Sequence, residues 1–333
     1  MLLLVPVSEH LSRKMGRLLV ALSICVSPIW SIELCPGSKA NQFFSEAPMQ
    51  MVDPVSKLVI LTSPKGGATV TAHLVFEYLS LTEKALATSP WIHTYRTTMY
   101  DKDPFYKKQN PCEVCKEGSE WTCLFIIRSP ADRVVSSFIH VLRTILAPRL
   151  PGYEDVFHKD PSFRDYIDVL MQFRRNETLQ FDDRHHAGPQ DITHHCNDDE
   201  SLDIKYVAVE FLDDGLRAFS NATGNRFGSN TSASSFTSPH YVEQYAAANE
   251  TLFTKDITQT PFSLLKSRQG AYPSYDSFFG HVDLNRDIFC CLFDDDLAMY
   301  QRTCTQSWLV QRCPTCEARC WREVARLNAL KAC

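Results

Sequence analysis

The segment Lys57-Leu-Val-Ile-Leu-Thr-Ser-Pro-Lys-Gly-Gly-Ala-Thr-Val70 decides the fold of this chain. Residues 57–62 have a continuous and partly β-branched apolar centre at 58–61, which is typical of a short strand buried on both faces. Beyond the glycines, Val70, Leu74 and Tyr78 recur at helical spacing. The segment therefore predicts a buried strand, a tight turn and a helix, which is the repeating unit of an α/β fold.

The turn between this strand and helix has the features of an anion-binding loop. Glycine lets the backbone wrap around an anion, and a helix N-terminus offers free N–H groups and the positive end of a dipole. A Walker A loop places its lysine after the glycines, whereas Lys65 precedes them here, so a nucleotide kinase or ATPase is disfavoured. An ordinary turn with an exposed lysine is the alternative. The candidate phosphate-binding residues are Lys65, Gly66, Gly67, Ala68, Thr69 and Val70.

A second junction of strand and helix follows the same plan. The apolar run 123–127 ends at Arg128, and Ser136 lies eight residues further on, in a helix predicted over 131–146. An arginine offers a forked, charged donor and a serine a hydroxyl, so the two can hold one phosphate together. Because ligands of open parallel sheets bind at the carboxyl ends of the strands, we expect both loops to face one crevice.

The remaining sequence continues the alternation of strands and helices. Further strands are predicted at 91–95 and 204–209, and further helices at 163–175, 211–222 and 285–302. The residues 33–56 and 101–120 are expected to be irregular and polar. This order predicts an α/β fold with a P-loop-NTPase-like parallel sheet that is flanked by helices on both faces.

Composition limits the classes of function. The chain has 333 residues, of which 44% are hydrophobic and 22% charged, as in ordinary globular proteins. Its net charge of −5 provides no basic excess for a nucleic-acid backbone, so no nucleic-acid partner is expected. Thirteen cysteines are present, and twelve remain when Cys25 of the apolar N-terminal stretch is set aside. An even number this large is typical of a disulfide-forming compartment.

The N-terminus also indicates the secretory pathway. Residues 18–32 are apolar and follow Arg13, Lys14 and Arg17, which predicts a signal peptide or signal anchor over residues 1–32. We expect a stem at 33–56, a main domain at 57–310 and a cysteine-rich tail at 311–333, with membrane contact only through the N-terminal segment. Four glycosylation sequons, at Asn176, Asn221, Asn230 and Asn249, agree with this location.

Together, these stretches resemble the cofactor loops of sulfotransferases. Pro64-Lys-Gly-Gly-Ala-Thr69 resembles the loop that holds the 5′-phosphosulfate of 3′-phosphoadenosine-5′-phosphosulfate (PAPS), and Arg128-Ser-Pro-x-x-Arg-x-x-Ser136 resembles the loop that holds its 3′-phosphate. Three later stretches resemble segments of the Golgi carbohydrate sulfotransferases, the branch with the chondroitin, HNK-1 and uronyl 2-O-sulfotransferases. These stretches are His186-Ala-Gly-Pro-Gln190, Ile204–Leu212 and Phe289–Leu297.

The resemblance implies an enzyme that transfers a sulfuryl group from PAPS to a hydroxyl of a glycan. Lys65 would neutralise charge on the leaving phosphate, while Arg128 and Ser136 would hold the 3′-phosphate. A base must accept the proton of the acceptor hydroxyl; His93 is the first candidate, and His186, with Gln190 positioning the acceptor, is the second. This chemistry requires no metal. The implied location is the Golgi membrane with a luminal domain, or secretion if the N-terminal segment is cleaved.

Two other functions remain open. A metal-dependent glycosyltransferase would use Asp101-x-Asp103 or Asp294–Asp296, although the second set is expected to be an exposed acidic face inside a helix. A catalytically inactive secreted binding protein of the same fold would fit Ala68, where sulfotransferase loops usually carry Ser or Thr. The pairs Cys112-x-x-Cys115 and Cys313-x-x-Cys316 are expected in disulfides, with zinc as the alternative.

Overall fold

A computed structural model describes residues 48–143, 160–175, 186, 188, 190, 196, 201–229, 256–265 and 273–331. Several predictions lie outside these residues. They concern the segment 1–32, most of the stem 33–56, residues 144–146 of the helix predicted at 131–146, and the sequons at Asn176, Asn230 and Asn249.

The centre of the fold is a four-stranded sheet with the order β1-β2-β3-β4. Strands β2 (Leu58–Thr62), β3 (Thr122–Ile127) and β4 (Ile204–Ala208) are parallel, whereas β1 (Met49–Asp53) is antiparallel to β2. The α/β class is therefore confirmed, but a sheet made only of parallel strands is wrong. Every residue of β2 is buried, as its apolar sequence predicts.

Strand β1 lies in the segment expected to be irregular. It joins β2 through a tight turn in which the Asp53 carboxylate accepts hydrogen bonds from the Val55 N–H (3.0 Å) and the Ser56 hydroxyl (2.5 Å). An aspartate that satisfies nearby donors in this way stabilises a turn, and the left-handed Lys57 (φ 52°) completes it. The turn brings residues 49–53 back along β2, so they are part of the sheet.

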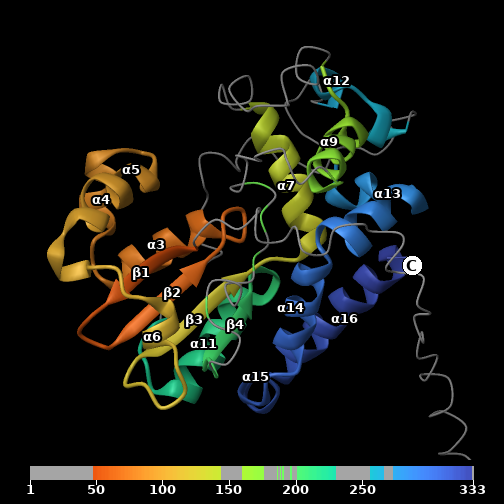
Figure 1. Ribbon diagram of the computed structural model, residues 1–333. Helices are drawn as coiled ribbons and strands as arrows, with labels where there is room; N and C mark the ends of the chain where they lie inside the picture. Colours follow the sequence, from red (N-terminus) through yellow and green to blue (C-terminus); the bar gives the residue numbers. More distant parts are fainter. Residues whose placement is uncertain are drawn as a thin grey trace, which may run out of the picture.

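Helices surround this sheet (Figure 1). Figure 1 shows α3, α4 and α5 beside β1, and α14, α15 and α16 on the β4 side. The prediction at 163–175 matches α9, and those at 131–146 and 211–222 correspond closely to α7 and α11. Among the described residues up to 229, the α-helices are α3 (Ala68–Tyr78), α4 (Thr82–Thr88), α5 (Ile92–Thr98), α6 (Pro111–Val114), α7 (Pro130–Arg143), α9 (Phe163–Arg175) and α11 (Leu212–Thr223).

One predicted strand is a helix. Residues 91–95 have the β-branched and aromatic composition of a strand, yet Trp91 caps α5 and residues 92–95 lie within this helix, which packs against α3. The Tyr95 ring meets the Phe76 ring edge-on, with 5.2 Å between centroids. Packing of this kind overrides a weak local preference for a strand. The predicted loop at 101–120 likewise contains short helical turns at 100–102, 104–106 and 111–114.

The C-terminal region is helical throughout its described part. The predicted helix 285–302 is divided into α13 (Val282–Arg286), a π-helix (Asp287–Leu292) and α14 (Asp294–Cys304). The cysteine-rich tail forms α15 (Ser307–Arg312) and α16 (Pro314–Lys331), and α16 packs against α14. A short helix, α12 (Phe262–Leu265), precedes this region. No helix among the described residues is long and apolar enough to cross a membrane.

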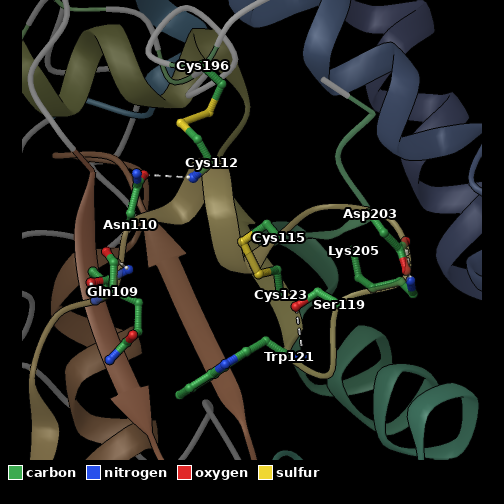
Figure 2. Close-up of a disulfide and its surroundings, with 11 residues drawn as sticks. Gln109, Asn110, Cys112, Cys115, Ser119, Trp121, Cys123, Cys196, Asp203 and Lys205 are labelled. Carbon is green, nitrogen blue, oxygen red and sulfur yellow. Dashed lines mark hydrogen bonds and ion pairs between the residues drawn. A yellow bond between two sulfur atoms is a disulfide. The ribbon is translucent and has the colours of Figure 1, made fainter. Parts of the chain in front are cut away.

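Disulfides fix the loops around the sheet. Figure 2 shows Cys112 of α6 bonded to Cys196, while Cys115 is bonded to Cys123 of β3. Two more disulfides join Cys304 to Cys320 and Cys313 to Cys316. Both Cys-x-x-Cys motifs are therefore in disulfides, but only Cys313 and Cys316 bond to each other.

A glutamine side chain covers part of the β4 edge. Gln306 Oε1 accepts a hydrogen bond from the Tyr206 N–H (2.9 Å), and Gln306 Nε2 donates to the Tyr206 carbonyl (3.1 Å). The side-chain amide thus pairs with β4 as the backbone of a neighbouring strand would.

Candidate functional site

The turn after β2 holds the first set of predicted residues in a close-packed conformation. Lys65 (φ 62°) and Gly67 (φ 110°) are left-handed, and the Gly66 N–H donates to the Ser63 carbonyl at 3.0 Å. A Cβ atom on Gly66 would lie 2.4 Å from Ser63 Oγ, and one on Gly67 would lie 2.7 Å from Val209 Cγ2. A side chain at either position would force these neighbours to move, and at Gly67 it would also strain the backbone.

The turn delivers the chain directly into the N-terminus of α3. Gly67 caps the helix, and Ala68, Thr69 and Val70 form its first turn, where N–H groups have no partner within the helix. These three N–H groups suit an anion. Gly66 was also predicted to bind the phosphate, but its N–H donates to the Ser63 carbonyl within the turn.

His93 contacts this loop through Thr69. His93 Nε2 lies 3.0 Å from Thr69 Oγ1, and Arg96 Nε donates to His93 Nδ1 at 3.3 Å. Because arginine can only donate, Nδ1 is the acceptor, and the proton of a neutral ring resides on Nε2. His93 then donates to Thr69 and leaves the threonine hydroxyl proton available for a phosphate oxygen.

The second predicted loop begins at Arg128, directly after β3. The Arg128 guanidinium lies over the Tyr275 ring, 5.5 Å from its centroid. The next residue is firmly held, since the Ser129 N–H donates to Glu210 Oε1 (2.8 Å) and the Ser129 hydroxyl donates to Glu323 Oε1 (2.5 Å). Ser136 lies on α7, where it is partly exposed.

Gln190 joins the two loops. Its Oε1 atom accepts hydrogen bonds from the Arg128 N–H (3.0 Å) and the Ser63 hydroxyl (3.4 Å), and its Nε2 atom donates to the Arg128 carbonyl (2.9 Å). The side chain is only 1% exposed. The loops that follow β2 and β3 therefore share one buried amide group, and a role of Gln190 in positioning an acceptor stays a prediction.

A buried ion pair holds Gln190 in place. Asp296 accepts from the Gln190 N–H (2.6 Å), from Gln190 Nε2 (3.2 Å) and from Arg133 Nη1 (2.9 Å). Arg133 also donates to the carbonyls of Pro64 (3.3 Å) and Gly188. Burial raises the pKa of Asp296, while Arg133 and the Gln190 donors act in the opposite direction.

This pair corrects the prediction for Asp294–Asp296. The residues open α14 rather than lying within a long helix, and the Asp296 side chain is fully buried instead of forming an exposed acidic face. Arg133 was not among the predicted site residues. The Arg-Ser-Pro-x-x-Arg motif contains Arg133 and could have marked it as a site residue. Its partner Asp296 could not be found in the same way, because it is 163 residues away in the sequence.

His186 is held against α7. Its Nε2 atom lies 2.7 Å from His140 Nδ1, and its carbonyl accepts from the Ser137 hydroxyl at 2.7 Å. His140 of α7 is therefore a direct neighbour of one of the two candidate bases. The two candidate bases contact different helices: His93 lies beside α3, and His186 lies beside α7.

Two carboxylates, those of Glu210 and Asp132, lie close to the loop that begins at Arg128. The Tyr300 hydroxyl donates to Glu210 Oε2 at 3.1 Å, opposite the bond from Ser129. Glu210 is partly exposed as a residue, but its carboxylate is enclosed, and this burial raises its pKa to about 7. Burial also raises the pKa of Asp132 on α7, against the opposing effect of Arg128. The Glu210 carboxylate, which is bonded to Ser129 of the second loop, thus has a pKa near neutral pH.

Each of the two acidic sets considered for a metal has one carboxylate that is paired with a cation. Asp101 pairs with Arg96 (3.1 Å) and Lys108 (3.6 Å), just as Asp296 pairs with Arg133. Within the described part of the chain, no group of three or more His, Cys, Asp or Glu residues is placed to hold a metal ion.

Comparisons with known proteins yield no relative: no family model, no curated protein and no solved structure matches the chain.

Proposed function

We propose that the chain is a PAPS-dependent sulfotransferase that acts on a hydroxyl of a carbohydrate in the secretory pathway. The observation that supports this most is the pairing of two anion-binding loops after adjacent parallel strands, β2 and β3, with Gln190 bonded to both. A nucleotide with phosphate groups at two separate positions fits such a pair of loops. In this proposal, the three parallel strands and their helices form a P-loop-like arrangement with helices on both faces.

The two loops divide the work of binding. The N–H groups of Ala68, Thr69 and Val70 hold the 5′-phosphate, and Lys65 balances the charge that develops on it as the sulfuryl group leaves. Arg128 and Ser136 bind the 3′-phosphate, which distinguishes PAPS from ATP. Holding both ends of the nucleotide orients the sulfuryl group for in-line attack by the acceptor oxygen.

We propose different roles for the two candidate bases. His93 orients the Thr69 hydroxyl, because Arg96 occupies its other nitrogen. His186 is the better candidate to accept the acceptor proton, since a second imidazole, that of His140, can share the resulting charge. The glycosyltransferase alternative has less support, because Arg96 pairs with Asp101 and Arg133 pairs with Asp296, one carboxylate in each of its two candidate sets.

Disulfides and an exposed sequon support the proposed location. Four disulfides join described residues, as expected in an oxidising compartment. Asn221 of the sequon Asn221-Ala-Thr223 is exposed near the end of α11, where a glycan can attach.

Thermal stabilisation by 3′-phosphoadenosine-5′-phosphate (PAP) tests the proposal. We expect PAP to raise the Tm of the folded chain, because a ligand that binds only the folded state stabilises it, while ATP, UDP and UDP with manganese have little effect. The shift should disappear in Lys65→Ala and in Arg128→Ala. Lys57→Ala is the matched control, since Lys57 is also left-handed but precedes β2. A shift with UDP and manganese alone, or no shift with PAP, contradicts the proposal.

A further inference from the structure

The buried contacts around Gln190 form one connected unit, which we call the Gln190 clamp: Gln190, Arg133 and Asp296. Each member bonds to at least one other, and Arg133 is fully buried. Burying an ion pair is costly in free energy, so a chain that needed only a stable core would do as well with apolar side chains here. The cost of burying Arg133 and Asp296 is therefore consistent with a role of these residues in positioning the two loops.

The clamp touches the two loops at points next to their ligand-binding groups. Arg133 Nε donates to the carbonyl of Pro64, the residue before Lys65. Gln190 bonds to both backbone groups of Arg128. A Cβ atom on Gly66 would lie 2.9 Å from Gln190 Oε1, so the amide also packs directly beneath the first loop.

We infer that the Gln190 clamp fixes the spacing between the two loops and thereby makes the site select a ligand with two anionic groups a set distance apart. This inference rests on the proposed function for the identity of the ligand, PAP. The coupling of the two loops by the clamp does not depend on the proposed function. Gln190, Arg133 and Asp296 are positioning residues, because they act through the Lys65 and Arg128 loops.

The test replaces Gln190 with methionine, which has a similar volume and no amide. Gln306→Met is the matched control, because Gln306 makes the same two bonds to the backbone of Tyr206 on the neighbouring strand and touches neither loop. Hydrogen exchange at the Gly66 amide is the first readout. Neither substitution removes an atom of the bond from this amide to the Ser63 carbonyl. Faster exchange in Gln190→Met alone therefore shows that the bond opens more often when the clamp is lost, and that the clamp orders the first loop.

Ligand selectivity is the second readout. In the wild type, PAP should bind more tightly than AMP, which carries a phosphate at the 5′ position only. We expect Gln190→Met to reduce this preference about tenfold or more, because misplaced loops no longer hold both phosphates at once. Gln306→Met should keep the preference. Asp296→Asn, which weakens the anchor of Gln190, should change both readouts in the same direction as Gln190→Met.

The outcomes separate this inference from the proposed function. Unchanged Gly66 exchange in Gln190→Met overturns the clamp, whatever the ligand. If exchange increases but wild-type protein binds PAP no better than AMP, then the clamp stands as a coupling of the loops and the proposed function fails. If PAP binds and Gln190→Met leaves the preference intact, then the clamp does not determine selectivity.

Discussion

At the scale of single residues, Gly67 shows how packing and backbone strain can be separated. Gly67 and Gly224 both have positive φ angles, 110° and 71°, so alanine is strained at either position. Only Gly67 faces a neighbour, because its Cβ atom would lie 2.7 Å from Val209 Cγ2, whereas nothing lies within 4 Å of the corresponding atom on Gly224. The two glycines therefore differ in contact, and Gly67 also lies further from the left-handed region that alanine can reach.

We expect Gly224→Ala to lower the free energy of unfolding by about 1 kcal/mol, through strain alone. Gly67→Ala should cost about 1–3 kcal/mol more, because Val209 must move. Urea unfolding of both variants measures the difference. Adding Val209→Ala to Gly67→Ala should recover much of this excess, and an equal cost for the two glycine variants would contradict the explanation.

Residue patterns predicted local features of this site better than distant ones. The turn at 63–67 was predicted because its lysine and glycines are consecutive in the sequence. The bonds of Gln190 could not be predicted, since they reach 62 residues to Arg128 and 106 residues to Asp296. Nothing in the sequence near Asp296 distinguishes its buried carboxylate from an exposed one.

At the scale of elements, features set by neighbouring residues were again predicted better than features set by distant contacts. Strands β2 and β3 were predicted because strands buried on both faces leave continuous apolar runs. Strand β1 was missed because its place depends on the turn at Asp53, and α5 was mistaken for a strand because contacts with α3 decide its conformation. The disulfides also act at this scale, and they enclose loops of very different length.

The Cys112–Cys196 disulfide spans 84 residues, whereas the Cys313–Cys316 disulfide spans three. Because a longer closed loop restricts the unfolded chain more, removing the first with paired alanines should cost about 4 kcal/mol and removing the second about 2 kcal/mol. Denaturant unfolding of the two double variants gives the comparison. Equal losses would show that local contacts, rather than loop length, determine what each disulfide contributes.

At the scale of the whole molecule, Glu210 connects the second loop with the C-terminal helices. Its carboxylate accepts from Ser129 after β3 and from Tyr300 of α14, while Glu323 of α16 holds the Ser129 hydroxyl. The tail predicted as a separate cysteine-rich segment thus contributes a contact to the loop that begins at Arg128.

This arrangement predicts a pH dependence of stability. Burial raises the pKa of Glu210 from 4.5 to about 7, so the folded state holds the proton more tightly than the unfolded chain. The resulting stability is fully present below about pH 4.5 and is lost as the pH rises through 7, by at most about 3 kcal/mol. Glu210→Gln should flatten the profile of unfolding free energy between pH 4.5 and 7.5, and the exposed Glu120→Gln should not. A profile unchanged in Glu210→Gln would place the titration on another group.

The Gln306 side chain has a consequence for solubility. A sheet edge with unpaired N–H and C=O groups is a template on which strands of other molecules can assemble into aggregates. By occupying both backbone groups of Tyr206, Gln306 blocks that template at one position of β4 while adding no strand of its own. The half-buried amide thus gives this edge local protection against the addition of a strand from another molecule.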